Sequence, residues 1–233
     1  MKKKLLSMLL VVAMVICLVP MTTGVASAAT SKKALIYQFS VSSDPSLTNW
    51  SKKIADQART NLRKLGYTCD TIMCGGVKMT GNNGISASEE LNRMAQYDVV
   101  LFTCHGYADK WTPGRIDLYM NLYITPNAVQ NWSGSLSKNK LIFIACCDAG
   151  RKVNGTSVAD KFKAKGAKAI VCYTDSLAPA FALDMTTLFF SRFAAVGADS
   201  AYQMQQYYNY MYNALNNLWP NHPYSMAALR FIR

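Results

Sequence analysis

Short apolar runs alternate with longer amphipathic stretches along the chain from residue 33 onward. The runs, most of them apolar nearly throughout, cover residues 33–40, 67–75, 97–106, 140–150 and 167–174. Continuous apolar runs of this length are typical of strands that are buried on both faces of a parallel sheet. We therefore expect each run to form a buried strand.

The stretches between these runs show helical spacing. In residues 46–66, Trp50, Ile54 and Leu62 recur at helical intervals and Gly66 provides a stop. Similar patterns predict helices in residues 87–96, in residues 157–166 and on both sides of Gly197 between residues 178 and 218. Because strands alternate with helices, we expect an α/β fold, a three-layer α/β/α sandwich with a mostly parallel sheet.

The first 28 residues have the features of a signal peptide. Lysines at positions 2 to 4 precede an apolar core, and Ala26-Ser27-Ala28 fits a small-residue cleavage site. At about 15 residues the core is shorter than the roughly 20 that span a membrane, and no second long apolar run follows. We expect a cleaved signal peptide in residues 1–28, one domain in residues 29–233, no membrane span in the mature chain, and a location outside the cell or in its envelope.

Basic residues outnumber acidic ones, 25 to 13, for a formal net charge of +12. Three of the basic residues lie in the signal segment, so the mature chain stays positive. This charge favours an anionic partner, such as a cell-wall polymer, a membrane surface or nucleic acid. Lys and Arg are scattered, however, and no run after residue 28 is longer than two. We interpret them as a solvated basic surface and expect no nucleic-acid partner; the oligomeric state cannot be read from this pattern.

The cysteines of the mature chain are compatible with disulfide bonds but do not require them. Outside the signal segment, cysteines stand at Cys69, Cys74, Cys104, Cys146, Cys147 and Cys172. An even number in an exported chain is compatible with disulfides, and Cys69 and Cys74, neighbours in one short segment, are the first pair to expect. Cys-x-x-Cys spacing is absent, so no structural zinc site is expected.

Candidate chemistry lies at the ends of two predicted strands. The run 97–106 ends in His105 and Gly106, and the run 140–150 carries Cys147 near its end. Working groups of parallel α/β sheets lie beyond the carboxyl ends of the strands, so neighbouring strands would bring imidazole and thiol together. A thiol nucleophile and an imidazole that moves protons suit covalent catalysis. The backbone N–H groups of Gly106 and Cys147 are the candidates for binding an oxyanion.

The motifs VVLFTCHG and LIFIACCDAG resemble those of caspase-like cysteine peptidases, the group of caspases, metacaspases, gingipains, clostripain, separases and CHAT-domain proteins. The stretch Cys147-Asp148-Ala149-Gly150 is similar to the metacaspase motif CHSG, and the resemblance spans roughly residues 33 to 215. It implies that Cys147 attacks the scissile carbonyl of a peptide or protein substrate, while His105 protonates the leaving amine and later activates water. It implies no cofactor, and the sequence leaves a need for calcium open.

Two cysteines compete for the role of nucleophile. Cys147 gives the Cys-x-x-Gly register, whereas Cys146 does not. Alternation along a strand sends the two side chains to opposite faces. We therefore expect Cys147 beside His105, and Cys104 and Cys146 facing each other on the other side as core residues.

The residue two positions before Cys147 departs from the family pattern. Caspases and metacaspases have a polar or acidic residue there that helps to hold the substrate side chain at P1, the residue whose carbonyl is attacked, and Ala145 cannot do so. Asp148 and Asp175 could instead attract a basic P1 side chain, although a cap and a loop acid are ordinary explanations. Trp111 and Tyr119 could shape a pocket, and packing explains them equally well.

The motifs favour an exported cysteine endopeptidase that works through a His105/Cys147 dyad and a thioester acyl-enzyme. The alternative is a catalytically inactive caspase-like domain that binds a protein or an anionic envelope component. A third hypothesis, a thiol hydrolase or acyltransferase, uses the same dyad on another substrate. The peptidase hypothesis predicts a thiol of low pKa, and the binding hypothesis predicts an ordinary thiol.

Overall fold

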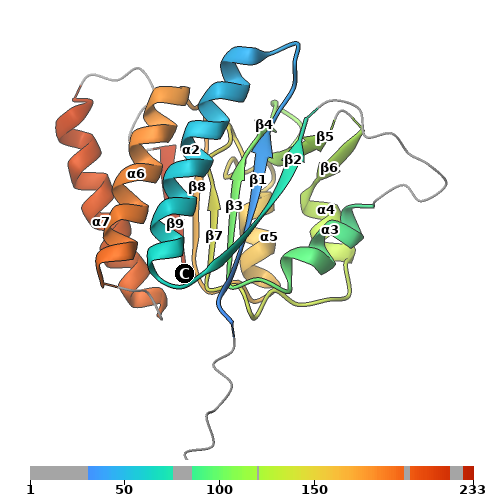
Figure 1. The fold of residues 1–233 in the computed structure, drawn as a ribbon. Helices are drawn as coiled ribbons and strands as arrows, with labels where there is room; N and C mark the ends of the chain where they lie inside the picture. The colour runs from blue at the N-terminus through green and yellow to red at the C-terminus, as the bar shows by residue number, and fades with distance from the viewer. Residues whose placement is uncertain (1–30, 76–85, 120, 197–199, 221–227) are drawn as a thin grey trace, which may run out of the picture. The chain divides into compact units, whose positions relative to one another are not determined.

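The computed structural model describes residues 31–75, 86–119, 121–196, 200–220 and 228–233. A six-stranded sheet in the order β2-β1-β3-β7-β8-β9 forms the centre of the domain (Figure 1). Its strands are β1 (Lys33–Phe39), β2 (Thr68–Cys74), β3 (Val99–Thr103), β7 (Leu141–Ile144), β8 (Ile170–Tyr173) and β9 (Leu229–Ile232). Neighbouring strands are parallel except β8 and β9, which pair antiparallel. The predicted mostly parallel sheet is confirmed.

Helices cover both faces of this sheet, which confirms the three-layer α/β/α sandwich (Figure 1). On one face lie α2 (Pro45–Lys64), α6 (Pro179–Val196) and α7 (Ala201–Leu218). On the other face lie α3 (Ala87–Met94), α4 (Pro126–Asn131) and α5 (Val158–Ala164). None of the helices in the described ranges is long and apolar enough to cross a membrane.

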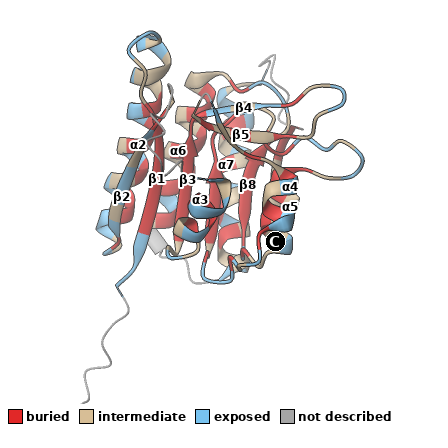
Figure 2. Ribbon diagram, turned by 90° about the vertical axis from the view of Figure 1, so that its right-hand side faces the viewer, coloured by how far each residue is buried: buried red, intermediate tan, exposed pale blue. Residues whose placement is uncertain are grey.

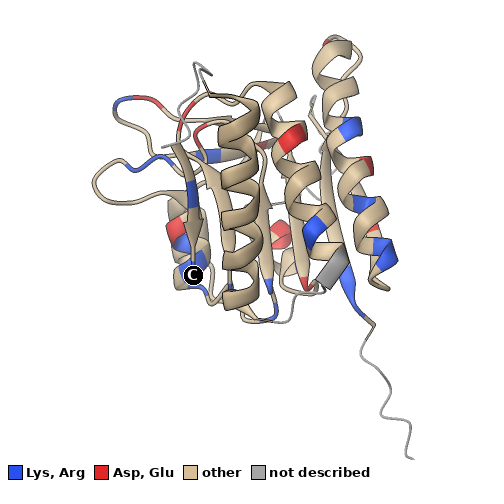
Figure 3. Cartoon of the chain, turned by 90° about the vertical axis from the view of Figure 1, so that its left-hand side faces the viewer, with Lys and Arg blue, Asp and Glu red and all other residues tan. Residues whose placement is uncertain are grey.

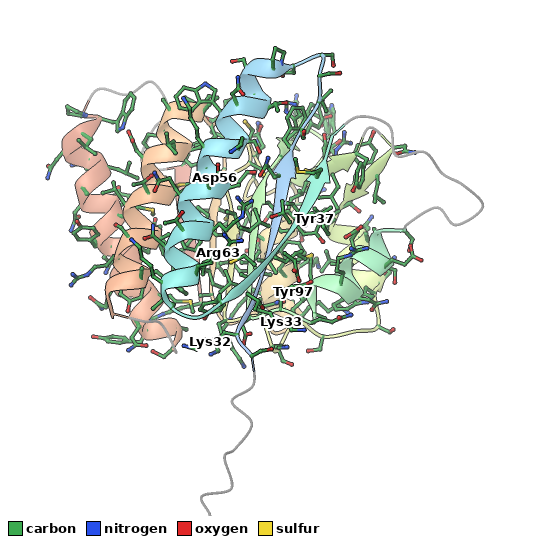
Figure 4. All side chains as sticks on the ribbon, viewed as in Figure 1. Lys32, Lys33, Tyr37, Asp56, Arg63 and Tyr97 are labelled. Atoms are coloured by element: carbon green, nitrogen blue, oxygen red, sulfur yellow. The ribbon has the colours of Figure 1, made fainter. Side chains whose placement is uncertain are left out.

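The runs that form β1, β3, β7 and β8 are buried on both faces (Figure 2). The run 67–75 is different, because β2 lies at the edge of the sheet and is largely exposed, so the expectation of a buried strand there is wrong. In β1, Ala34 and Ile36 pack into the core under α2 and α6, whereas Leu35 packs into the opposite core under α3 and α5. Tyr37 also faces that second core, where it stacks on Phe102 at 4.7 Å between ring centroids. Its position within the sheet is labelled in Figure 4. The period of two explains why strands with two buried faces read as continuous apolar runs.

A short loop after β1 delivers the first turns of α2 to the edge of the sheet where the strands end. The Asp44 side chain accepts a hydrogen bond from the Leu47 N–H, and Pro45 occupies the first turn, so the helix start is well defined. Deeper in the helix, Ser51 is buried and its hydroxyl accepts from the Phe39 N–H at 2.8 Å. These contacts hold α2 against the carboxyl end of β1.

A second, three-stranded antiparallel sheet lies beside the first. It contains β4 (His105–Tyr107), β5 (Arg115–Tyr119) and β6 (Leu122–Ile124). The expected hairpin within residues 109–123 is therefore present as β5 and β6. The expectation of a single strand in 97–106 is wrong, because the chain bends at Cys104 and His105 begins β4, where it pairs with Asp117.

Three further expectations need correction or stay outside the described residues. The strand expected in 140–150 ends at Ile144, after which the chain turns through Gly150. Cys69 and Cys74 both lie on β2 and are free; five residues of extended strand separate them by about 16 Å, beyond the roughly 7 Å limit for a disulfide. The signal segment lies outside the described residues.

Candidate functional site

The carboxyl ends of β3 and β7 bring His105 and Cys147 to one place. These strands are parallel neighbours, with Phe102 opposite Ile144 at the last registered pair. The chain continues from there to His105 on one side and to Cys147 on the other, and both residues line one cavity of about 140 Å³. Strand order therefore places both residues at the carboxyl edge of the sheet, and the shared cavity shows that the imidazole and the thiol lie on the same side of it.

Elements far apart in the sequence enclose this cavity. They are the first half of α2, the ends of β3 and β7, and the segment that leads from β8 into α6. The lining residues are Leu47, Trp50, Ser51, Ile54, Thr103, Cys104, His105, Ala145, Cys146, Cys147, Leu177, Pro179 and Ala182.

Gly106 allows the two strand ends to touch. A Cβ atom added to it would lie 1.9 Å from the Cys147 carbonyl oxygen and 3.0 Å from the Cys146 Cβ. Real Cβ atoms do not approach backbone oxygen so closely, so a side chain here would push β4 away from the turn after β7. The absence of a side chain at Gly106 thus sets the separation between the residue before it, His105, and Cys147.

The thiol of Cys147 is half-buried and points toward the segment before α6. The Leu177 N–H donates a hydrogen bond to the Cys147 Sγ at 3.2 Å. Burial raises the pKa of the Cys147 thiol, and the Leu177 N–H opposes this shift without cancelling it. The low pKa that a peptidase nucleophile would have is therefore not found in this structure, and the thiol is protonated at neutral pH.

His105 is exposed at the mouth of the cavity. Its ring meets Phe39 edge-on, with 4.9 Å between ring centroids. In the small sheet it stands directly opposite Asp117, which accepts from the Arg115 guanidinium at 2.8 Å. Among the described side chains no hydrogen bond joins His105 to Cys147; such bonds are often long in enzymes without substrate and tighten when it binds.

Cys104 and Cys146 face away from Cys147. Their sulfurs lie 3.6 Å apart in the core under α3 and α5, whereas Cys147 packs against the opposite core. Burial raises the pKa of the Cys104 thiol well above its ordinary value. The alternation expected for these cysteines is present, and Cys147 is the one whose sulfur meets the side of the sheet occupied by α2 and α6.

Asp148 and Asp175 do not line the cavity. The Asp148 N–H donates to the Asp175 carbonyl at 3.0 Å, and the Asp148 carboxylate lies 3.6 Å from the Arg151 guanidinium. Burial raises the pKa of Asp148. The Asp175 carboxylate accepts from the Ser176 N–H at 2.7 Å. Both acids thus organise the turn after Cys147 and the loop after β8.

Trp111 and Tyr119 lie outside the cavity as well. Trp111 is 78% exposed, and the Tyr119 hydroxyl donates to the Met73 carbonyl at 3.2 Å. The aromatic residue that does line the cavity is Trp50, which the helical pattern assigned to core packing. Its position could have been inferred from one signal, because a helix that directly follows β1 starts at the same sheet edge as the motifs.

Comparison with known proteins gives likenesses in structure only. No protein-family model matches the sequence, and no curated protein matches it. Among solved structures, a secreted C11 cysteine protease from Bacteroides thetaiotaomicron, in complex with an irreversible peptide inhibitor, matches with 13% identity and a TM-score of 0.45, over 79% of this chain and 59% of that one. A complex of the pro- and mature domains of RgpB from Porphyromonas gingivalis matches with 13% identity and a TM-score of 0.47, over 81% of this chain and 44% of that one.

Both of these proteins are caspase-like cysteine peptidases, the group that the sequence motifs resemble. The aligned part spans less than two thirds of each of them. At this identity the likeness concerns the fold alone, and with TM-scores below 0.5 it carries no argument about chemistry. The chemistry rests on the side chains around the cavity.

Proposed function

We propose that the protein is a cysteine endopeptidase of caspase-like type in which His105 and Cys147 form the catalytic dyad. The observation that carries the proposal is their position on two neighbouring strand ends, where both line one cavity. A nucleophile and a base that open onto the same space satisfy the first geometric requirement for covalent catalysis on a bound substrate.

Cys147 attacks the carbonyl carbon of the scissile bond through its sulfur. Because the resting thiol is protonated, His105 takes the thiol proton as the C–S bond forms. The tetrahedral intermediate then collapses to a thioester, the C–N bond breaks, and the His105 proton passes to the leaving amine. Water next attacks the thioester, His105 accepts a proton from the water, and the proton returns to the sulfur as the acid product leaves.

Backbone N–H groups support the negative charges of these steps. The Leu177 N–H at 3.2 Å from the Cys147 Sγ stabilises the thiolate as it forms. The N–H groups of Gly106 and Cys147, on the two chain segments that touch at the cavity, are the proposed oxyanion donors. No cofactor takes part in this scheme. Asp148 and Asp175 keep the turn after Cys147 and the loop after β8 in place.

We place the mature protein outside the cell or in its envelope, acting on peptides or proteins, because the first 28 residues have the pattern of a cleaved signal. The segment and its cleavage are open to a direct check. Amino-terminal sequencing of the protein from culture supernatant should begin at Ala29. A protein that keeps Met1 and stays in the cytoplasm would contradict this part of the proposal.

A second candidate function is favoured by the raised pKa of Cys147 and by the exposed position of His105. Both features suit a caspase-like domain that binds a protein or an anionic envelope component without cleaving it. Such a domain would keep the cavity as a binding pocket. The two candidates differ in one property, the reactivity of the Cys147 thiol toward a substrate-like electrophile.

Labelling by peptidyl acyloxymethyl ketones separates the two candidates. These probes place a peptide in the substrate position and alkylate the nucleophile only when it is activated. Wild-type protein should be labelled, Cys146→Ala should be labelled at a similar rate, and Cys147→Ala and His105→Ala should not be. Absence of labelling in folded wild-type protein, with and without calcium, would favour the binding domain.

A further inference from the structure

The cavity beside Cys147 begins where the P1 side chain of a substrate must lie. The carbonyl carbon that Cys147 attacks is one bond from the P1 Cα, so the P1 side chain has to enter space within a few ångströms of the sulfur. The cavity is lined by both His105 and Cys147, and it is therefore the candidate receptor for that side chain. What lines the rest of it decides which side chains fit.

The walls of the cavity are mostly apolar. Helix α2 contributes Leu47, Trp50 and Ile54. The end of β7 contributes Ala145, and the segment into α6 contributes Leu177 and Ala182. No Asp, Glu, Lys or Arg of the described ranges is among the lining residues.

Ser51 and Thr103 bring two hydroxyl groups to the cavity, and both are hydrogen-bonded to backbone groups at the ends of the strands. Ser51 Oγ accepts from the Phe39 N–H at 2.8 Å and lies 2.7 Å from the Thr103 carbonyl, to which it can donate. Thr103 Oγ1 donates to the Tyr37 carbonyl at 3.0 Å. A hydroxyl has a single proton to donate, so neither hydroxyl has a proton left to donate to a polar P1 side chain. Both residues are also buried, which leaves them little surface to present.

Helix α2 carries charged side chains close to the cavity-lining Trp50. On α2, the Lys53 ammonium lies over the Trp50 ring at 4.9 Å from its centroid, and Lys52 pairs with Asp56 at 2.5 Å. Figure 3 shows charged positions along α2 and none along α7. Because Lys53 lies over the Trp50 ring that lines the cavity, its charge disfavours a basic P1 side chain there. An acidic P1 side chain would have to leave its charge unpaired among apolar walls.

The size of the cavity limits what can enter. Its volume is about 140 Å³, close to the roughly 150 Å³ of an apolar protein cavity that accepts benzene. A branched aliphatic side chain or a phenyl ring therefore fills it, whereas an alanine side chain leaves most of it empty.

We infer that this protein selects an apolar P1 side chain of the size of leucine or phenylalanine, recognised by the cavity between α2, the end of β7 and the start of α6. The inference rests on the proposed peptidase function and names its substrate class. It departs from the sequence-based expectation that Asp148 or Asp175 attracts a basic P1 side chain, because neither acid lines the cavity.

The test is a panel of acyloxymethyl ketones that differ only at P1, carrying Leu, Phe, Ala, Arg, Asp or Asn. The second-order rate of Cys147 alkylation is measured for each by mass spectrometry. We expect Leu or Phe to react about ten-fold or more faster than Ala, Arg and Asp, as a filled apolar pocket discriminates by roughly 10- to 200-fold per methylene. Fastest reaction with Arg, Asp or Asn overturns the P1 inference and leaves the peptidase function standing. No reaction with any probe overturns both.

A cavity-filling variant tests the same inference from the protein side. Ala182 is buried on α6 at the cavity wall, so Ala182→Leu should lower the ratio of the Leu-probe rate to the Ala-probe rate by about ten-fold. The matched control is Ala214→Leu on α7, which does not line the cavity and should leave that ratio unchanged. If Ala182→Leu does not fold, Leu47→Ala, at a half-buried position, should instead raise the rate with Phe relative to Leu. An unchanged ratio in a folded cavity variant contradicts the inference.

Discussion

Gly106 lies so close to Cys147 that a Cβ atom on it would be 1.9 Å from the Cys147 carbonyl oxygen. This contact joins the start of β4 to the turn after β7, and those are the two segments that carry the proposed dyad. The position of His105 depends on it, because His105 directly precedes Gly106, and both His105 and Cys147 line the cavity. The contact therefore links the fold to the chemistry.

Substitution of Gly106 by alanine should separate the dyad. The added methyl group overlaps the backbone carbonyl oxygen of Cys147, and overpacking of this kind costs about 1–3 kcal/mol of unfolding free energy. We expect Gly106→Ala to lose probe labelling of Cys147 even under conditions in which the protein remains folded. Labelling and thermal unfolding should be measured on the same samples.

Gly155→Ala is the control for that variant. A Cβ there meets nothing within 4 Å, and its φ of +75° costs an L-residue backbone strain alone, about 1–2 kcal/mol. It should keep labelling at the wild-type rate. Equal labelling of Gly106→Ala and Gly155→Ala would mean that the close contact does not set the dyad.

The reactivity of Cys147 without substrate should depend on pH in the direction set by its burial. Burial raises the pKa of the Cys147 thiol, and the hydrogen bond from the Leu177 N–H only partly opposes this. Alkylation by iodoacetamide, a small reagent without a peptide, should rise with pH and be half-maximal above about 8.5, the ordinary thiol pKa. Peptide mapping measures the alkylation of Cys147 at each pH. A midpoint below that value would contradict the buried environment of the sulfur.

The raised pKa of Cys147 also makes the stability of the fold depend on pH. A thiol whose pKa is raised in the folded state stabilises the fold at pH values below its unfolded-state pKa, and this contribution is lost as pH rises through the folded-state value. The unfolding free energy of wild-type protein should therefore fall more steeply at alkaline pH than that of Cys147→Ala. Identical slopes in denaturant titrations would count against it.

Cys146 and Cys147 should respond differently to serine. Cys146 is buried with its sulfur 3.6 Å from that of Cys104, so a hydroxyl at this position would have only a weak thiol partner and should cost about 1–3 kcal/mol of unfolding free energy. Cys147→Ser, at a half-buried position beside the Leu177 N–H, should cost less than Cys146→Ser. Chemical denaturation of both variants measures the difference, and a larger loss in Cys147→Ser would reverse the assignment of the two faces.

Arg230 on β9 should stabilise the turn that follows Cys147. Its guanidinium donates to the Gly150 carbonyl at 2.6 Å and to the Asp160 carboxylate at 3.2 Å. Arg230→Met removes both bonds and should cost about 1.5–3 kcal/mol, the usual range for hydrogen bonds to charged groups. The matched control is Arg233→Met at the exposed end of the chain, which should change the unfolding free energy little.

Because Arg230 contacts Asp160, the Arg230→Met substitution should also change how the unfolding free energy depends on pH. Burial raises the pKa of the Asp160 carboxyl, but the hydrogen bond from Ser157 and the charge of Arg230 outweigh it and hold the pKa below its ordinary value. A lowered carboxyl pKa stabilises the fold at pH values above about 3.9, and this contribution is lost as pH falls further. The loss on acidification should be smaller in Arg230→Met than in wild-type protein.

Much of the fold follows from the sequence because buried parallel strands are recognisable by themselves. The runs that contain Leu35, Val100 and Ile142 are apolar without interruption, and the helices between them have clear periods and caps. The edge strand β9 was not expected, because four residues that include Arg230 carry no periodic signal. Its place depends on antiparallel pairing with β8, which is a long-range property.

The residues of the candidate site could be predicted from the sequence, whereas the shape of the cavity could not. His105 and Cys147 follow strand ends, which the pattern of the chain shows, whereas the start of β4 at His105 depends on pairing with Asp117 in the second sheet. The cavity depends on how α2, which carries Trp50, packs against α6, which carries Ala182, and no local sequence pattern reports such packing. The raised pKa of Cys147 is likewise a product of tertiary burial.

The most direct test of the dyad is a double-mutant cycle on peptide hydrolysis by His105→Ala, Cys147→Ala and the double variant, with a fluorogenic peptide whose P1 residue is leucine. Residues that act as one unit are strongly non-additive. Each single substitution should therefore reduce kcat/KM by roughly 10³-fold or more, and the double variant should lose no more than either single one. Additive losses, or hydrolysis that survives Cys147→Ala at the wild-type rate, would contradict the account.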